Sequence, residues 1–253
     1  MQRHLQLIGA AIFIAAILFS GCNLSAASHE TKIFEGIEMV KIPAGEVPGF
    51  WIGKYEVTQK QYEDIMGNNP SYFKGNPNNP VEQVSWYSAV EFCNKLSMKA
   101  NFKPYYIINK NKKDAENKYQ YDNVKWTVTI NKGNNGFRLL TSKEHEYAYR
   151  AGTITTYCWG NKINGDYCWF RDNSGQTTHP VGQKKQNAWG LFDMSGNVFE
   201  WCFDWFDNRG YNRVSRGGSW LSNMEYVRAV NIYDPPPSYA YYSIGFRLAR
   251  TVE

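Results

Sequence analysis

Arg-Gly-Gly-Ser-Trp at residues 216–220 and Ile-Gly-Phe-Arg at residues 244–247 bound the stretch that says most about this chain. Both ends combine glycine with a bulky aromatic residue, which indicates a stiff frame. The residues between them, 221–243, are mostly tyrosine, proline and small polar residues. A stiff frame around such a segment predicts a surface patch whose side chains can change without touching the core.

The composition is typical of a globular chain with one substantial core. Of its 253 residues, 43% are hydrophobic and 16% aromatic, and we expect one folded domain rather than two. Most of the aromatic residues must be structural. The basic residues behind the net charge of +5 are spread out apart from Lys-Asn-Lys-Lys at 110–113. We interpret that run as a solvated loop, so no nucleic-acid partner is expected.

The N-terminus has the pattern of an export signal. A short basic start precedes the apolar run 5–19, which is too short for a membrane span. Leu-Phe-Ser-Gly-Cys at 18–22 resembles a bacterial lipoprotein processing site, so Cys22 is the expected lipidation site and its acyl chains would hold the protein on a membrane. An ordinary secretory peptide cleaved nearby is the alternative. We expect a signal peptide at 1–21, a lipidated tether at 22–34, and a location at the outer membrane or cell surface of a bacterium.

The cysteines of the remaining chain do not form a metal motif. Four follow the predicted lipidation site, namely Cys93, Cys158, Cys168 and Cys202. Outside the cytoplasm they could pair, and three connectivities stay open. Cys93 lies on an apolar stripe and is expected to be buried. Neither Cys-x-x-Cys nor His-x-x-x-His occurs, so a zinc site is not expected.

Three helices and several short strands are predicted. The expected helix caps are Thr58, Ser85 and Thr141. Gln61 and Glu144 complete capping boxes with the first and last of them. Strands are expected near 39–46, 50–57, 201–205 and 245–250, and an insert at 101–135 contains two strand-like runs that suggest a hairpin.

Seven motifs of this chain resemble, in the same order, those of the formylglycine-generating enzyme, or sulfatase-modifying factor, family. They lie at residues 39–45, 56–58, 80–86, 137–141, 190–201, 216–220 and 245–247. The resemblance implies one domain over residues 35–253 with an α+β fold of the C-type lectin-like kind, in which few helices pack against small twisted sheets with long loops.

The chemistry of that family is expected to be absent here. Its oxidases carry one cysteine two residues beyond the Gly-Gly-Ser-aromatic motif and a second five residues later, where this chain has Ser222 and Val227. A hydroxyl does not bind cuprous copper as a thiolate does, and valine offers no ligand. We therefore predict no catalytic residue and no enzyme activity. An oxidase acting on a sulfatase cysteine is the alternative.

The C-terminal segment resembles the variable region of proteins diversified by retroelements, and we expect that region to span about 214–250. Tyrosine gives large contact area at low entropy cost, and Pro-Pro-Pro at 235–237 stiffens the loop. The expected partner is therefore a variable protein or a surface ligand. The expected ligand-binding residues are Leu221, Ser222, Tyr226, Ile232, Tyr233, Asp234, Ser238, Tyr239, Tyr241, Tyr242 and Ser243. The alternative is that the tyrosines are buried strand residues.

One further resemblance concerns a metal. Asn197, Val198 and Glu200 match a family loop that binds calcium in several members, and oxygen ligands suit this hard cation. A structural calcium ion is thus one interpretation. An asparagine-stabilised turn with Glu200 paired to an arginine is the other.

Overall fold

The structure, a computed structural model, describes residues 29–252, so the predicted signal peptide and Cys22 lie outside the described residues. The helices are α1 (Gln59–Met66), α2 (Trp86–Lys99) and α3 (Ser142–Arg150). The first strands are β1 (Thr31–Phe34), β2 (Ile37–Ile42), β3 (Phe50–Gly53), β4 (Tyr106–Lys113) and β5 (Trp126–Ile130). The later strands are β6 (Phe137–Arg138), β7 (Phe199–Trp205), β8 (Arg213–Arg216), β9 (Ile244–Gly245) and β10 (Ala249–Thr251).

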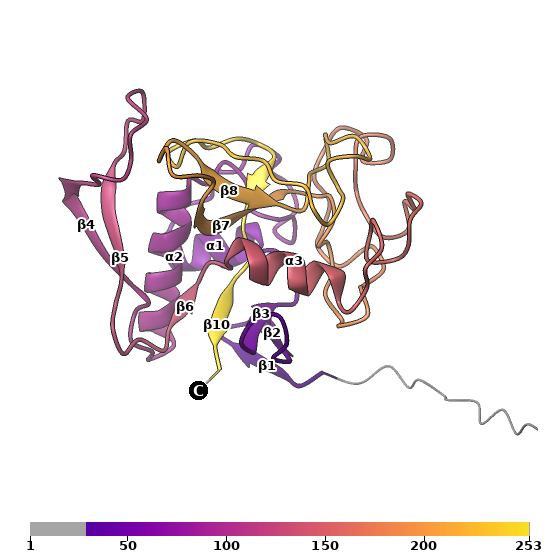
Figure 1. The fold of residues 1–253 in the computed structure, drawn as a ribbon, viewed down its shortest axis with the longest axis horizontal. Helices are drawn as coiled ribbons and strands as arrows, with labels where there is room; N and C mark the ends of the chain where they lie inside the picture. Colours follow the sequence, from indigo (N-terminus) through magenta and orange to yellow (C-terminus); the bar gives the residue numbers. More distant parts are fainter. Residues whose placement is uncertain (1–28, 253) are drawn as a thin grey trace, which may run out of the picture.

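The two ends of the domain meet in one sheet. Its strand order is β1-β2-β3-β10-β6, and every neighbouring pair is antiparallel. The C-terminal β10 lies between β3 and β6, with Ala249 opposite both Ile52 and Arg138. Figure 1 shows this yellow strand beside the indigo strands of the N-terminus. The last residues of the chain therefore complete the sheet that the first residues begin.

A second sheet carries the segment that follows the Gly-Gly-Ser-Trp motif. Its order is β8-β7-β9, in which β7 pairs antiparallel with β8 and parallel with β9. The predicted insert forms the separate hairpin β4–β5, which lies beside α2 with its tip extending away from the body (Figure 1). Long loops fill the side beyond α3 (Figure 1).

The core is built around α2 and two fully buried tryptophans. Trp86 donates its indole N–H to the carbonyl of Cys202 at 3.0 Å, and Trp201 donates to the carbonyl of Val84 at 2.8 Å. A buried indole needs such a partner, so each ring contributes apolar area without an unpaired donor. These two bonds join α2 and the segment just before it to β7.

The predicted helix caps are confirmed. The hydroxyls of Thr58 and Thr141 accept from the backbone N–H three residues later, and both capping boxes are complete. Ser85 caps α2 in the same way. Cys93 is buried, as its place on the apolar stripe predicts.

The predicted tether boundary is wrong at its C-terminal end. Residues 31–34 form β1, which pairs with β2 from Thr31 opposite Val40 to Phe34 opposite Ile37. Three of the four side chains of β1 are exposed, whereas Phe34 packs against the core, so this edge strand shows no apolar alternation. The folded domain therefore begins by Thr31 rather than at residue 35.

The described cysteines are unpaired, and the described helices are not membrane spans. All four cysteines in residues 29–252 are free thiols, so none of the three open connectivities is formed. Within the same part of the chain, none of the helices has the length and apolar character needed to cross a bilayer.

Candidate ligand-binding site

Two glycines shape the start of the candidate site. Gly217 and Gly218 both have left-handed backbone conformations, with φ of +90° and +78°. A Cβ on Gly218 would lie 2.6 Å from a methyl group of Val227 and 2.8 Å from the carbonyl oxygen of Tyr226. Only glycine allows both this conformation and this approach. The Gly-Gly pair thus brings residues 226–227 back against the motif that precedes them.

Trp220 connects the two ends of the predicted patch. Its backbone N–H donates to Asn197 at 2.8 Å, and its indole N–H donates to the carbonyl of Tyr242 at 3.0 Å. The ring also lies 5.5 Å from the ring of Tyr242. The stiff frame expected from the sequence is therefore a set of bonds that hold residue 220 beside residue 242.

A hollow of about 440 Å³ lies between residues 221–226 and 233–243. Six of the predicted ligand-binding residues line it: Leu221, Ser222, Tyr226, Tyr233, Tyr241 and Ser243. Three further residues complete its wall, namely Arg171, Phe199 and Asn223. The volume is within the range of small ligand sites, roughly 300–1,000 Å³.

The apolar wall of the hollow is fixed by strand pairing. The rings of Phe199 and Tyr233 lie 5.0 Å apart. Tyr233 exchanges backbone hydrogen bonds with Ser215 of β8, and the N–H of Phe199 donates to the carbonyl of Ser243 at 2.8 Å. These rings belong to two segments that only the β8-β7-β9 sheet brings together.

Arg171 is a site residue that the sequence analysis missed. It lies about fifty residues before the predicted patch, and its backbone N–H donates to the carbonyl of Ser222 at 3.0 Å. Its side chain is exposed and is the single charged group among the nine residues that line the hollow. Within residues 29–252 it forms none of the ion pairs. No local motif marks it, because its position depends on a long-range backbone bond.

A row of tyrosines, here called the tyrosine ridge, extends from the hollow; its members are Tyr72, Tyr239, Tyr241 and Tyr242. Ring centroids are 5.5 Å apart for Tyr239 and Tyr241, 3.9 Å for Tyr241 and Tyr242, and 5.9 Å for Tyr72 and Tyr242. Tyr72 is 66% exposed. Sequence reasoning missed it too, since it comes from the loop after α1.

The tyrosines of residues 239–242 are not uniformly exposed, which corrects the sequence interpretation in part. Tyr239 is 37% exposed, whereas Tyr241 and Tyr242 are half-buried. Tyr241 packs against the main core, and Tyr242 contacts the rings of Phe73 and Trp220. Neither alternative therefore describes Tyr241 and Tyr242 alone, because both rings are partly buried against the protein and also belong to the ridge.

Five predicted residues do not line the hollow: Ile232, Asp234, Ser238, Tyr239 and Tyr242. Asp234 accepts from the side-chain amide of Asn212 at 2.9 Å. Ser238 donates two hydrogen bonds to the side chain of Asp122, which lies in the insert. One comes from its backbone N–H, at 3.1 Å, and the other from its hydroxyl. These two polar side chains hold the proline loop in place rather than facing the hollow.

Two predicted contact residues are buried. Ser222 accepts from the backbone N–H of Ser219 at 3.0 Å, and the two hydroxyls are 3.2 Å apart. Ser243 is buried as well, although both serines form part of the wall. Both serines are therefore part of the frame as well as of the wall of the hollow.

The calcium interpretation does not fit the geometry. The side-chain oxygen of Asn197 accepts from the N–H of His179 at 3.0 Å, and its carbonyl accepts from Trp220. Glu200 accepts from Arg247 through both oxygens at 2.7 Å. Residues 29–252 contain no group of three or more His, Cys, Asp and Glu residues placed to hold a metal ion. The side-chain oxygens of Asn197 and Glu200 already have protein donors, as the alternative of an asparagine-stabilised turn and an arginine pair expects.

Val198 belongs to this turn through its backbone alone. Its N–H donates to Glu56 at 3.0 Å, and Asn197 donates its amide to the same carboxyl group at 2.7 Å. Burial raises the pKa of Glu56 well above its ordinary value, and the nearby charges of Asp193 and Glu200 raise it further. This cluster is fully buried, which suits a structural role.

The four thiols within residues 29–252 are poorly suited to oxidation chemistry. Burial raises the pKa of Cys158 and of Cys168 to about 12, and it also raises the pKa values of Cys93 and Cys202. The thiolate is the nucleophile and the metal ligand, so these groups are inert at neutral pH. Val227 packs with Cys168 in a small apolar cluster rather than at a polar site.

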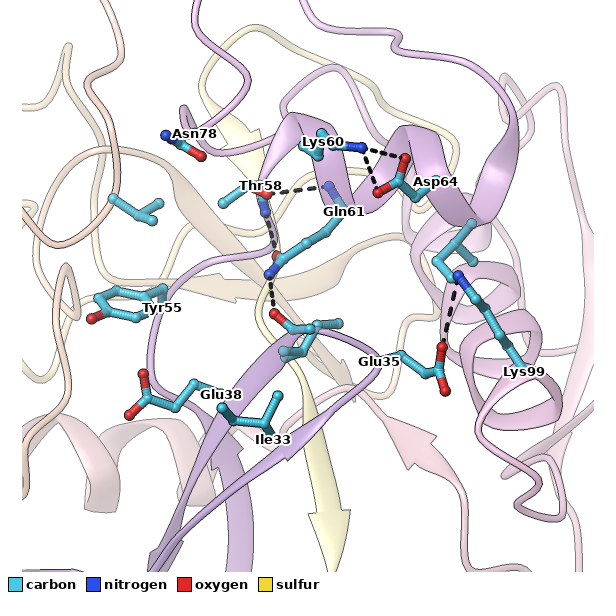
Figure 2. A pocket seen from close by; sticks show the side chains of 14 residues that line it. Ile33, Glu35, Glu38, Tyr55, Thr58, Lys60, Gln61, Asp64, Asn78 and Lys99 are labelled. Atoms are coloured by element: carbon cyan, nitrogen blue, oxygen red, sulfur yellow. Dashed lines mark hydrogen bonds and ion pairs between the residues drawn. The ribbon is translucent and has the colours of Figure 1, made fainter.

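A second hollow of about 440 Å³ lies between α1 and the β1–β2 turn (Figure 2). Its charges are paired: Lys60 lies 2.8 Å from Asp64, and Lys99 lies 3.8 Å from Glu35. None of the predicted site residues lines it. Paired charges leave less for a ligand to satisfy, so we take the hollow at Arg171 as the candidate site.

The comparisons with known proteins agree with this fold. The model of the sulfatase-modifying factor enzyme 1-like domain matches residues 42–252, so the chain belongs to this family. It is 47% identical over 248 residues to a Paenibacillus barcinonensis protein named chaperone protein LppX, covering 84% of this chain and 88% of that one. It is 26% identical over 211 residues to the formylglycine-generating enzyme of Streptomyces coelicolor, covering 71% of this chain and 55% of the enzyme.

Among solved structures, variable protein 1 of Treponema denticola superposes with a TM-score of 0.76 and 30% identity, covering 88% of this chain and 99% of that one. The expected C-type lectin-like α+β fold is thus confirmed, as is the resemblance to variable proteins.

Proposed function

We propose that this protein binds ligands without catalysis, through the hollow and the tyrosine ridge. The observation that carries the proposal is convergence: Leu221, Tyr226, Tyr233 and Tyr241 of one segment meet Arg171 and Phe199 at a single hollow. The frame beneath is held by backbone bonds to Trp220 and Tyr233. Ligand sites combine such an apolar wall with few polar groups on a rigid support.

The comparisons support a non-catalytic role. The relative that is 47% identical is named as a chaperone, and a variable protein shares the fold. Ser222 and Val227 occupy the positions that the motif spacing assigns to the oxidase cysteines. A buried hydroxyl and an apolar side chain supply no copper ligand there.

We also propose that the protein is an exported lipoprotein displayed on a bacterial surface, with Cys22 as the lipidated residue. Cells fed an alkyne-tagged fatty acid should label the wild-type protein and not the Cys22→Ala variant. Protease added to intact cells should degrade the labelled protein. Unlabelled wild-type protein would contradict the anchor, and protection in intact cells would contradict display.

The binding role is tested by selecting a phage-displayed random peptide library on the domain. Tyr226→Ala and Leu221→Ala should each abolish binding of most selected clones, because both side chains line the hollow. Tyr121→Ala and Ile154→Ala are matched controls, since Tyr121 is 72% and Ile154 is 96% exposed at other places. Clones that bind all four variants as well as the wild type would place binding elsewhere and overturn the proposal.

The alternative, oxidation of a sulfatase cysteine, predicts a different result. Copper-loaded protein would convert the cysteine of a Cys-x-Pro-x-Arg peptide to an aldehyde in the presence of oxygen. We expect the peptide to keep its thiol, as measured by mass spectrometry. Turnover would overturn the non-catalytic role.

A further inference from the structure

The positive charge of Arg171 gives the hollow a preference for an anionic ligand group. An arginine always carries its charge and offers five donors in a planar fork that matches a carboxylate. Every other residue lining the hollow is uncharged, and within residues 29–252 the guanidinium lies in none of the ion pairs. The charge at this rim is therefore uncompensated.

The base of Arg171 is held in position although its side chain is exposed. Its N–H is bonded to the carbonyl of Ser222, and the N–H groups of Asn173 and Ser174 donate to the carbonyl of Phe170 just before it. A guanidinium on a fixed backbone loses less freedom on binding than one on a mobile loop. An anionic ligand group at the mouth of the hollow would thus meet a prepared donor.

The rest of the hollow favours an apolar group. The rings of Phe199 and Tyr233, which are tilted against each other, and the side chain of Leu221 form its wall. Tyr226, which is 51% exposed, also lines the hollow. A volume of about 440 Å³ accommodates one or two large side chains. The hydroxyl of Ser222 is already bonded to Ser219 and is therefore less available to a ligand.

We propose that this hollow binds a protein segment that presents a carboxylate next to a large apolar side chain, with the carboxylate on Arg171. The proposal rests on the proposed function, because it names the ligand class of the same site. A neutral glycan would leave the guanidinium unpaired, and a bare anion would leave the aromatic wall uncovered.

The test repeats the peptide selection on three proteins: wild type, Arg171→Gln and Lys143→Gln. Lys143 is an exposed cation on α3 outside the hollow, so its variant controls for net charge. Clones selected on wild type and on Lys143→Gln should be enriched in Asp or Glu beside Phe, Trp, Leu or Ile. Clones selected on Arg171→Gln should lose the acidic enrichment and keep the apolar one.

A synthetic peptide of the strongest clone sharpens the result. Changing its acidic residue to the amide should weaken binding to wild type about tenfold, as for one charge-assisted bidentate pair, and should weaken binding to Arg171→Gln less than about twofold. Arg171→Lys should retain part of the difference, since it keeps the charge and loses the fork.

The possible failures are distinguishable. Clones that need Tyr226 but show no acidic enrichment would overturn the ligand class and leave the binding role standing. Equal affinity of the acid and amide peptides would do the same. If a neutral oligosaccharide binds the wild type and not Tyr226→Ala, the ligand class is a glycan and the proposed peptide ligand is wrong. An absence of clones that depend on the hollow would overturn the binding role itself.

Discussion

Arg247 and Arg171 show how differently one residue type is used in the two regions of this molecule. Arg247 is fully buried and donates to both oxygens of Glu200 and to the carbonyls of Gly53 and Phe192. Arg171 stands exposed at the hollow, outside the ion pairs of residues 29–252. A buried charge must be saturated by its own chain, whereas an unsaturated charge at a rigid rim remains for a ligand. The number of hydrogen-bond and ion-pair partners within the protein therefore distinguishes a frame arginine from a site arginine, whereas the residue type does not.

The largest effect should follow from breaking the buried cluster. Arg247→Ala leaves Glu200 without its main counter-charge next to Glu56, and we expect a loss of about 3–5 kcal/mol in unfolding free energy. Urea denaturation measures it. Arg209→Ala removes an exposed arginine and should cost under about 0.5 kcal/mol. Similar losses for both variants would contradict the distinction between frame and surface.

A pH experiment examines the same cluster. Burial raises the pKa of Asp193 to about 6, above its ordinary value of 3.8. The unfolded chain therefore loses this proton first, and the carboxyl group lowers stability as pH rises from about 4 to 6. Asp193→Asn lacks this titration, so its unfolding free energy relative to wild type should rise over that interval, by at most about 3 kcal/mol, and then level off. A difference independent of pH would show that Asp193 titrates normally.

The tyrosine ridge should respond in a graded way. Tyr242→Ala removes contacts with Phe73 and Trp220 and should cost about 1–2 kcal/mol, less than a fully buried ring. Tyr239→Ala should cost under about 0.5 kcal/mol because that ring is more exposed. Thermal melting of the two variants side by side measures the order. The reverse order would mean that the ridge is not anchored at Trp220.

The smallest effect on stability is expected at the hollow. Arg171→Gln should change the unfolding free energy by less than about 0.5 kcal/mol, since Arg171 forms none of the ion pairs in the part of the chain that the structure describes. Denaturation under the conditions used for Arg247→Ala gives the comparison. A loss of several kcal/mol would mean that Arg171 is part of the frame, and its role toward a ligand would then be untenable.

Local features were predictable from the sequence, and the reason is their short range. Thr58 with Gln61 and Thr141 with Glu144 interact over three residues, so their pattern is visible without the fold. The Gly-Gly-Ser-Trp turn was predictable for the same reason, because its motif consists of neighbouring residues. In contrast, β1 was missed because three of its four side chains are exposed, so its residues show no apolar alternation and its position depends on pairing with β2 and on the contacts of Phe34.

The sequence by itself determined the family, the three capped helices and the stiff frame around residues 221–243. Tertiary structure alone decided which of those side chains meet, because burial and pairing depend on contacts far apart in the chain. It brought Arg171 and Tyr72 to the patch, turned Ser222 inward and paired Glu200 with Arg247 in place of a calcium ion. A sequence motif shows which polar groups are present. Packing alone decides which of their donors and acceptors have no partner in the protein and can bind a ligand.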